Sequence, residues 1–409
     1  MKIIFSSLSG YAHVYPLLPL ALAAREVGHD VIYATGERFH SMLEGLGFPI
    51  APVGIPIRDA FGMVAAEMGA GTGGPPPGDG LEPAARALHE ILPRRFAADL
   101  LPVLRAERPD LVVYEALNPG AGLAAHRAGI PAVCHANTRA EALDRSRQRG
   151  MELLRAVAAE IGVESTEDGY LLGDRYLDIF PPSLQEPSFL ARAERTPLRP
   201  VAFGEAGELP EIVLAERKRP LVYLTLGTVV GTAPVLRAAI DGLSALDVDV
   251  VVAAAGPKIW GAEFGALASN VHFGTWVPQA DLLPLVDLVV HHGGSGTTLG
   301  AAGVGVPQLF LPAAVDGFHN AGAVSAAGAG IRLLPGRFEQ VDDRGRPPEG
   351  FGQGEVPLPA DVVSAEVVAE AADRLLTDPE TGQAAKTLAE EIAAMPSPAE
   401  VATRLPEFR

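Results

Sequence analysis

The chain has 409 residues, which is long for one domain and natural for two domains of about 200 residues each. Its 32 Lys and Arg residues against 50 Asp and Glu give a formal net charge of −18, which excludes nucleic acid and anionic lipid as principal partners. A single cysteine, Cys134, excludes a disulfide framework and fits a reducing cytosol. Because Cys134 lies in a short apolar run, we expect a buried core thiol.

Alternating strand and helix patterns fill the first half of the chain. Apolar runs predict strands, and longer amphipathic runs between them predict helices. The strands are expected at Lys2–Phe5, Asp30–Ala34, Leu111–Tyr114 and Ile130–Val133, and the helices at Pro16–Val27 and Gly120–Ala128. This alternation predicts a parallel sheet covered by helices. Residues 57–81 do not fit the pattern, because their Gly- and Pro-rich part cannot form regular structure.

The same alternation restarts in the second half. Strands are expected at Leu221–Thr225, Val248–Ala253, Val271–Phe273, Val286–Val290 and Gln308–Leu311, and late helices at Ser364–Thr377 and Glu380–Ala394. The polar insertion at residues 336–355 leaves disorder and a mobile lid equally open. We therefore expect an N-terminal domain (1–205), a linker (206–219), a C-terminal domain (220–380), and a C-terminal helix and tail (381–409) that can pack back on the N-terminal domain.

The sequence around residue 292 combines a strand, two histidines, a Gly-rich turn and a helix start. After Val286–Val290 come His291 and His292, then Gly293–Gly296, with helix from Thr297 onward. A turn that opens a helix presents unpaired backbone N–H groups at the positive end of the helix dipole, which suits a diphosphate. A dinucleotide fingerprint is the competing interpretation, but Leu299 replaces its third glycine. A plain tight turn is the other alternative.

Several motifs together resemble those of GT-B glycosyltransferases, in the bacterial natural-product branch of the family that includes the plant UDP-glycosyltransferases. They span the chain, and they are Trp276-Val277-Pro278-Gln279, His292-Gly293-Gly294, Asp316, Asn320-Ala321 and residues 10–21, 109–117, 181–185, 198–203 and 224–228. The resemblance implies an α/β fold, GT-B, with two Rossmann-like doubly wound domains facing across a cleft. It implies an inverting, metal-independent hexosyltransferase that uses a nucleotide-diphosphate sugar as co-substrate and needs no cofactor.

The resemblance also implies which residues bind the donor. Trp276 and Val277 would contact the nucleobase, although Trp276 could instead be a core aromatic. Asp316 would accept hydrogen bonds from sugar hydroxyls, although it could instead cap the helix that follows. The diphosphate would be held by His292, by the N–H groups of Gly294, Ser295 and Gly296, by the Thr297 hydroxyl, and from the other side by Gly227 and Thr228.

Polar residues of the plant signature are replaced by glycine at three positions. Gly300 stands where that signature has a ribose-binding Glu, Gly296 where it has Asn, and Gly317, after Asp316, where it has Gln. A donor with fewer hydroxyls needs fewer polar partners, and unpaired polar groups would penalise its apolar faces. We therefore expect a dTDP-deoxysugar donor, with UDP-glucose as the alternative.

Inverting sugar transfer needs a base for the acceptor hydroxyl, and His13 is the candidate. Histidine titrates near neutral pH, and His13 follows the first strand, at the sheet edge where open α/β sheets bind ligands. His13 also matches the base of the family. Glu115 aligns with the acid that orients that base, and many relatives have Asp there. The alternatives are a structural surface histidine and a buried strand-end acid or acceptor contact.

Acceptor and metal sites are less clearly marked. The resemblance implies a polyketide or other antibiotic-type aglycone, with acceptor contacts expected from Phe61, Met63, Met68, Asn137 and Phe318. Ordinary amphipathic helices would explain these apolar residues equally well. We expect no metal site: Asp247 and Asp249 suggest a solvated strand end, and His291 a packed side chain.

The expected function is thus sugar transfer to a hydroxyl of a hydrophobic natural product. The alternatives are a UDP-hexose-using transferase, a nucleotide-sugar epimerase, and a non-catalytic helper protein of the same fold. A helper would be expected to lose the base and the diphosphate motif, and the chain keeps His13 and His292. No signal peptide or membrane span is apparent, so we expect a cytoplasmic protein. The sequence leaves a homodimer open.

Overall fold

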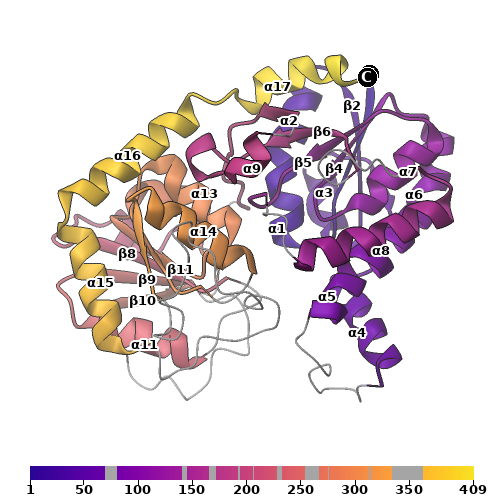
Figure 1. Cartoon of the computed structure of the whole chain (residues 1–409). Helices are drawn as coiled ribbons and strands as arrows, with labels where there is room; N and C mark the ends of the chain where they lie inside the picture. Colours follow the sequence, from indigo (N-terminus) through magenta and orange to yellow (C-terminus); the bar gives the residue numbers. More distant parts are fainter. Residues whose placement is uncertain are drawn as a thin grey trace. The chain divides into compact units, whose positions relative to one another are not determined.

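The computed structural model describes residues 1–69, 81–140, 145–164, 172–191, 194–205, 207–227, 233–253, 267–274, 276–312, 315–333 and 363–409. These residues form two compact units, Met1–Arg199 with Met395–Arg409, and Pro200–Ala394 (Figure 1). The predicted insertion at 336–355 and the Gly- and Pro-rich residues 70–80 lie outside the described residues.

The first unit is built on a seven-stranded parallel sheet of order β3-β2-β1-β4-β5-β6-β7. Its strands are β1 (Lys2–Ser6), β2 (Asp30–Thr35), β3 (Ile50–Pro52), β4 (Leu111–Glu115), β5 (Ala132–His135), β6 (Arg175–Asp178) and β7 (Arg195–Pro197). The four strands predicted here are confirmed as β1, β2, β4 and β5. Cys134 on β5 is 1% exposed, which confirms the buried thiol, and burial holds its pKa well above the ordinary value.

Helices cover this sheet, and short ones follow several strands. They are α1 (Tyr11–Val14), η1 (Tyr15–Leu17), α2 (Leu18–Glu26), η2 (Glu37–Phe39), α3 (His40–Gly45), α4 (Ile57–Glu67), α5 (Leu81–Arg86), η3 (Ala87–Ile91), α6 (Leu92–Glu107), α7 (Pro119–Ala128), α8 (Arg145–Ile161), η4 (Pro182–Leu184) and α9 (Pro187–Leu190). The expectation of irregular structure is wrong for Ile57–Glu67. Ala60 and Val64 are buried one turn apart, so this stretch has the apolar stripe that a helix needs.

The second unit contains a six-stranded parallel sheet of order β10-β9-β8-β11-β12-β13. Its strands are β8 (Leu221–Thr225), β9 (Asp249–Ala253), β10 (Val271–Gly274), β11 (Leu288–His291), β12 (Gln308–Phe310) and β13 (Gly330–Arg332), and the first five were predicted within two residues. The helices are α10 (Glu211–Leu214), α11 (Ala233–Ser244), α12 (Gln279–Leu282), η6 (Leu283–Leu285), α13 (Ser295–Val304), α14 (Val315–Ala326), α15 (Ala365–Thr377) and α16 (Pro379–Ala393).

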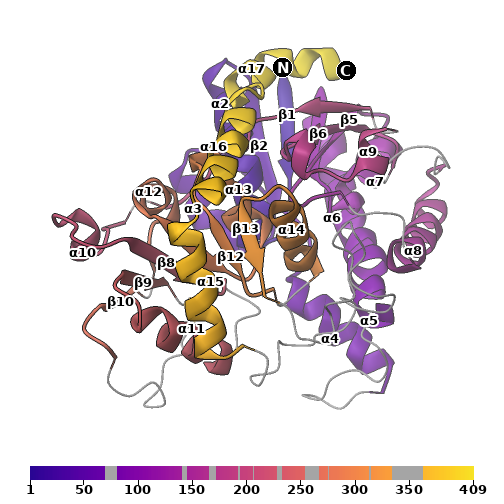
Figure 2. The ribbon, with the colours of Figure 1, turned by 60° about the vertical axis from the view of Figure 1, so that its left-hand side comes forward.

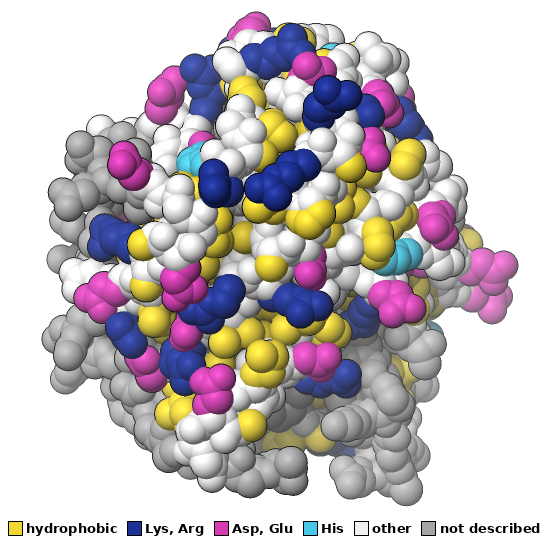
Figure 3. Space-filling model, turned by 90° about the vertical axis from the view of Figure 1, so that its right-hand side faces the viewer, with side chains coloured by type: hydrophobic (Ala, Val, Ile, Leu, Met, Phe, Trp, Pro, Cys, Tyr) yellow, Lys and Arg dark blue, Asp and Glu magenta, His cyan; other side chains and the backbone are white. Residues whose placement is uncertain are grey.

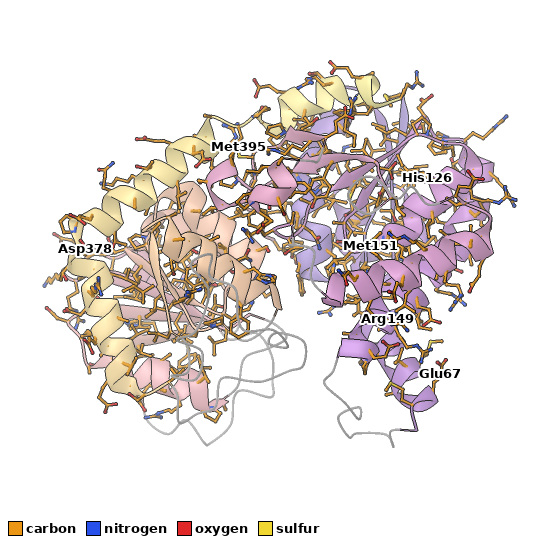
Figure 4. The ribbon with its side chains drawn as sticks, viewed as in Figure 1. Glu67, His126, Arg149, Met151, Asp378 and Met395 are labelled. Carbon is orange, nitrogen blue, oxygen red and sulfur yellow. The ribbon has the colours of Figure 1, made fainter. Side chains whose placement is uncertain are left out.

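Two apolar clusters form the core of the second unit. In one, α11 and α15 pack beside each other against the sheet, through residues such as Leu236, Ile240 and Val368 (Figure 2). The other cluster includes Val277, Leu283 and Val289. At the start of α16 the Asp378 carboxylate accepts a hydrogen bond from the Glu380 N–H at 3.0 Å, so the two last helices of this unit are separated by a side-chain cap (Figure 4).

The division between the units differs from the predicted one at both ends. Residues 206–219, expected to be a linker, include α10, and Val213 of α10 packs with Leu221 and Tyr223 in the second core. At the other end, α16 belongs to the second unit, and only residues from Met395 onward belong to the first. There the Arg199 N–H donates to the Pro396 carbonyl at 2.8 Å.

The last residues, α17 (Pro398–Arg404) and η8 (Leu405–Phe408), are part of the first unit and pack beside α2 (Figure 1). Val401 and Leu405 are buried, and the Arg175 guanidinium lies 5.0 Å from the centre of the Phe408 ring. His29 Nε2 lies 3.2 Å from the Ala402 carbonyl oxygen. The tail is therefore an integral part of this unit's core.

Charged side chains of both signs are interspersed on the face drawn in Figure 3. Many are paired, for example Arg149 with Glu82 at 2.7 Å and Arg94 with Glu160 at 2.9 Å. His126 of α7, marked in Figure 4, is 2.8 Å from Asp174, and this hydrogen bond raises the pKa of the histidine. Within the described ranges, no helix is long and apolar enough to cross a membrane.

Candidate active site

His13 and Glu115 meet at the carboxyl edge of the first sheet. β1 and β4 are neighbours, Glu115 is the last residue of β4, and His13 lies in α1 just after β1. The Nδ1 atom of His13 is 2.9 Å from Glu115 Oε1 and 3.1 Å from Oε2. The Glu115 side chain is fully buried and also accepts a hydrogen bond from the Leu8 N–H at 3.1 Å. The structure thus brings together the two residues predicted as base and acid.

This contact favours one tautomer of the His13 imidazole. A carboxylate accepts hydrogen bonds, so this contact favours the tautomer with the proton on Nδ1 and the lone pair on Nε2. The His13 side chain is 13% exposed, so the ring is largely enclosed. Gly10 makes room for it, because a Cβ at Gly10 would lie 2.8 Å from His13 Cδ2. The arrangement has the geometry of a base whose second nitrogen is oriented by an acid.

Asn137, which was predicted to contact the acceptor, lies beside this pair. Its side chain is only 5% exposed, and its Nδ2 atom is 3.4 Å from His13 Nδ1. The loop reaches this position because β5, which precedes it, runs next to β4, with Glu115 opposite His135. His135 is itself fully buried, and burial lowers its pKa to about 4.

The other residues expected to contact the acceptor are not brought together within either unit. Phe61 and Met63 lie on α4 and are 37% and 47% exposed, and Met68 follows that helix half-buried. Phe318 lies on α14 of the second unit and is 7% exposed, so most of its ring is already packed. Phe61 and Met63 are therefore exposed enough to contact a ligand, whereas the Phe318 side chain is mostly buried.

The second unit places its Gly-rich turn at the end of β11. The turn passes through Gly293, which has a φ of +91°, and Gly294 is the N-cap residue of α13. The first residues of α13 direct their N–H groups away from the helix, where an anion can accept them. Asp316, in the first turn of α14, approaches this end: its Oδ2 atom is 3.4 Å from both the N and Oγ atoms of Ser295. Asp316 thus faces α13 and is not the cap of its own helix.

His292 is enclosed by glycines at this turn. A Cβ at Gly227, whose φ is +74°, would lie 2.5 Å from His292 Cε1, and a Cβ at Gly294 would lie 2.5 Å from Nε2. His292 Nδ1 is buried and has no hydrogen-bond partner among the described residues. Burial lowers the pKa of His292, against the opposing effects of Asp316 and of a hydrogen bond to the Thr225 backbone. The glycines hold a neutral imidazole beside the N-terminus of α13.

The neighbouring histidine is a packing residue, as predicted. His291 is fully buried, its Nδ1 accepts the Gly293 N–H at 3.2 Å, and its Nε2 lies 3.0 Å from Gln308 Oε1. Burial, with a contribution from His292, lowers the pKa of His291 to about 3. His291 therefore stabilises the turn and leaves His292 as the histidine of the site.

Three further predicted donor residues can be compared with the structure. Trp276 is 43% exposed, which excludes a core aromatic, whereas Val277 is 6% exposed and can offer a ligand little besides its backbone. Thr297 Oγ1 donates to Gln279 Oε1 at 3.1 Å, so its hydroxyl proton is engaged within the protein. Thr228 lies outside the described residues.

Gln279 had no predicted role, although it belongs to the motif at residues 276–279. Its Oε1 atom also accepts a hydrogen bond from Tyr223 Oη at 3.4 Å.

Gly317, Asp247 and Asp249 were also singled out in the sequence, and the structure shows the surroundings of each. A Cβ at Gly317 would lie 2.4 Å from the His292 carbonyl oxygen, so a glycine is needed for α14 to approach the turn. Asp247 is 91% exposed, as predicted, but Asp249 is 7% exposed and pairs with Arg219 at 2.8 Å, so the strand end is only partly solvated. The described residues include no group of three or more His, Cys, Asp or Glu side chains arranged to hold a metal ion.

Known proteins resemble this chain over its whole length. Residues 237–344 match the family model "Erythromycin biosynthesis protein CIII-like, C-terminal domain". L-demethylnoviosyl transferase of Streptomyces niveus is 32% identical over 356 residues, which are 81% of this chain and 85% of that protein. Elloramycin glycosyltransferase ElmGT of Streptomyces olivaceus is 28% identical, with 99% and 97% covered. The solved structure of the Streptomyces sp. SF2575 glycosyltransferase SsfS6, complexed with thymidine diphosphate, is 26% identical with a TM-score of 0.76, covering 100% of this chain and 99% of that one.

Proposed function

The chain belongs to the GT-B glycosyltransferases of natural-product biosynthesis, and on that premise we propose that it transfers a deoxysugar from a dTDP-sugar to a hydroxyl of a hydrophobic aglycone, with inversion. In this proposal the second unit holds the nucleotide sugar and the first unit activates the acceptor hydroxyl. The observation that carries the proposal is the hydrogen bonding of His13 Nδ1 to both oxygens of the buried Glu115 carboxylate.

The proposed chemistry at His13 follows from this contact. With the proton on Nδ1, the lone pair of Nε2 accepts the proton of the acceptor hydroxyl while the oxygen attacks the anomeric carbon. The imidazolium that forms keeps its proton on Nδ1 and donates it in a hydrogen bond to Glu115, whose carboxylate stabilises the positive charge. The bond from the anomeric carbon to the diphosphate breaks as the new glycosidic bond forms, so the configuration at that carbon inverts.

The leaving diphosphate is proposed to be stabilised at the start of α13. Backbone N–H groups of the first turn, the helix dipole and the His292 imidazole, whose Nδ1 has no partner among the described residues, together offer donors to an anion. These fixed donors supply the stabilisation that a metal ion provides in other transferases, so we propose a metal-independent reaction with no cofactor. Trp276, with its exposed indole, is proposed to stack on the nucleobase, and Asp316 to accept hydrogen bonds from the sugar.

The preference for dTDP is supported by the surroundings of Gly300. A Cβ at Gly300 would lie 2.7 Å from Leu283 Cδ1, so the space beyond this backbone position is filled by an apolar side chain. A ribose-binding carboxylate cannot be accommodated there without repacking. An unpartnered 2′-hydroxyl would lose its hydrogen bonds to water, whereas deoxyribose has none to lose. The relatives are consistent with this: the SsfS6 structure contains thymidine diphosphate.

A competition between donors tests this proposal. The purified protein is given equal amounts of a dTDP-deoxysugar and UDP-glucose with a panel of aromatic and macrolide aglycones, and the glycosides and free nucleotides are quantified by mass spectrometry. We expect glycoside formation with dTDP released at least about tenfold faster than UDP, which corresponds to one lost hydrogen bond of about 1.4 kcal/mol. Preferential use of UDP-glucose would overturn the donor assignment. Failure to bind dTDP at all would instead favour the helper-protein alternative.

A further inference from the structure

The Asn137 amide, as placed, turns a hydrogen-bond donor toward a nitrogen of His13 that is itself a donor. His13 Nδ1 is within 3.1 Å of both Glu115 oxygens, so it must carry a proton, yet its third neighbour is Asn137 Nδ2 at 3.4 Å. An amide N–H cannot donate to an imidazole nitrogen that is itself protonated. Meanwhile Asn137 Oδ1 is buried and has no hydrogen-bond partner among the described residues.

Exchanging the two ends of the amide resolves the contact to His13. The oxygen and nitrogen of an Asn side chain are assigned from the hydrogen-bond network, and here that network favours the oxygen on the imidazole side. In this orientation Asn137 Oδ1 faces the Nδ1–H of His13 and becomes a third acceptor beside the Glu115 carboxylate. The exchange replaces an unfavourable donor-to-donor contact with a donor-to-acceptor contact, while Nδ2 takes the position that Oδ1 leaves, where the described residues offer no partner.

The loop that carries Asn137 is tied down on both sides of it. Before it, the Ala136 N–H donates to the Leu177 carbonyl at 2.9 Å. After it, the Ala140 N–H donates to Gln185 Oε1 at 3.0 Å, and Gln185 Nε2 in turn donates to Asp178 Oδ1 at 2.9 Å. The backbone on either side is therefore fixed to β6 and to the segment after it. A buried polar side chain that cannot withdraw from the imidazole is best explained by its effect on that imidazole.

We propose that Asn137 is a positioning residue of the base, whose carboxamide oxygen shares the Nδ1 proton of His13 with Glu115 and so fixes the tautomer and orientation of the ring. The proposal rests on the proposed function, in which His13 is the base. When Nε2 takes the proton of the acceptor hydroxyl, the Nδ1 proton stays in place, and the negative end of the amide dipole stabilises the imidazolium. The sequence suggested instead that Asn137 contacts the acceptor.

The test is a direct titration of the imidazole that does not depend on activity. Long-range proton–nitrogen NMR spectra report the tautomer and pKa of each of the 10 histidines, and His13 is identified by the signal lost in His13→Gln. We expect the wild type to show the Nδ1–H tautomer of His13. Asn137→Leu, of similar volume but without a polar atom, should lower the pKa of His13 by roughly half a unit to one unit, because the imidazolium loses an acceptor.

Asn118→Leu is the matched control. Asn118 is also a buried asparagine at this sheet edge with an unpaired Oδ1, but its Nδ2 atom donates to Ser6 Oγ at 3.1 Å and not to the imidazole. Its substitution should leave the His13 titration within the error of the wild type. An Nε2–H tautomer of His13 in the wild type would overturn the proposal without any variant, as would an unchanged titration in folded Asn137→Leu.

Kinetics separate this role from an acceptor contact. If Asn137 orients the base, Asn137→Leu should lower kcat by roughly three- to tenfold, with KM for the aglycone within about twofold of the wild type. A raised KM with an unmoved His13 titration would show an acceptor contact instead, and would overturn the proposal. Retained transfer in His13→Gln would refute the proposed function itself, whereas the NMR titration would still report whether Asn137 contacts the ring.

Discussion

At the scale of single residues, two adjacent histidines have opposite environments. His291 uses both ring nitrogens within the protein, on the Gly293 N–H and on Gln308, whereas His292 keeps a buried Nδ1 without a partner among the described residues. The difference follows from the end of the strand, because His291 is the last residue of β11 and His292 is the first residue of the turn after it. Sequence alone indicated which histidine was packed, but not that glycines enclose the other.

The contact between Gly294 and His292 predicts the effect of a methyl group added at Gly294. Gly294→Ala keeps an allowed backbone conformation, with φ of −59° and ψ of 140°, but its Cβ would lie 2.5 Å from His292 Nε2. Because the imidazole is enclosed and cannot move aside, we expect dTDP affinity to fall by roughly tenfold or more in isothermal titration calorimetry.

Gly303→Ala is the control for this substitution. It lies on the exposed side of the same helix, and its Cβ would meet only Ile392 Cγ2 at an ordinary 3.9 Å. Helix propensity predicts that it stabilises the protein by up to about 1 kcal/mol without changing dTDP affinity. Equal affinities for the two alanine variants would show that the position of His292 does not matter for the nucleotide.

At the scale of elements, the strands were the most predictable part of the fold. β8 is a continuous apolar run between Pro220 and the Gly227 turn, and it was predicted to the residue. Buried parallel strands give such runs because both faces are covered by helices. Short edge strands such as β3 and β13, three residues each, were not predicted, because so few residues carry no periodicity.

The candidate site was predictable only where it coincides with an element boundary. The turn at residue 292 and the base at His13 each follow a strand end, and the carboxyl ends of parallel strands collect at one edge of a sheet. The place of Asn137 could not be predicted, because it depends on tertiary hydrogen bonds such as that between Ala140 and Gln185, whose residues are far apart in sequence. Helix α4 was missed because its apolar stripe is narrow and is followed by a Gly- and Pro-rich stretch.

At the scale of the whole molecule, three buried histidines couple stability to pH. Burial lowers the pKa of His135, His291 and His292, so these side chains are neutral in the folded protein but titrate near 6.5 when unfolded. Above the unfolded pKa, the free energy of unfolding does not depend on the protonation of these histidines. As the pH falls from there toward the folded pKa, the unfolded chain binds more protons, and the free energy of unfolding decreases. The stability should therefore decline from about pH 6.5 downward, by about 1.4 kcal/mol each for His135 and His291 at pH 5.5, with His292 acting in the same direction.

Urea unfolding at pH 7.5 and pH 5.5 checks this expectation. His126 titrates in the opposite sense, since its pKa is raised, and its contribution is already complete below about pH 6.5. The second unit contains His291 and His292 and the first contains His135, so the transition of the second unit should shift more. Unfolding midpoints that stay the same at the two pH values would contradict the assignment of these side chains as neutral and buried.

The measurement that tests the account most directly compares His13→Gln and His292→Gln with the wild type in two assays, dTDP binding by calorimetry and sugar transfer by mass spectrometry. We predict that His13→Gln binds dTDP within about twofold of the wild type but loses transfer by a factor of about 100 or more, because only the base is removed. His292→Gln should weaken dTDP binding by roughly tenfold. Transfer by His13→Gln at the wild-type rate would contradict the account.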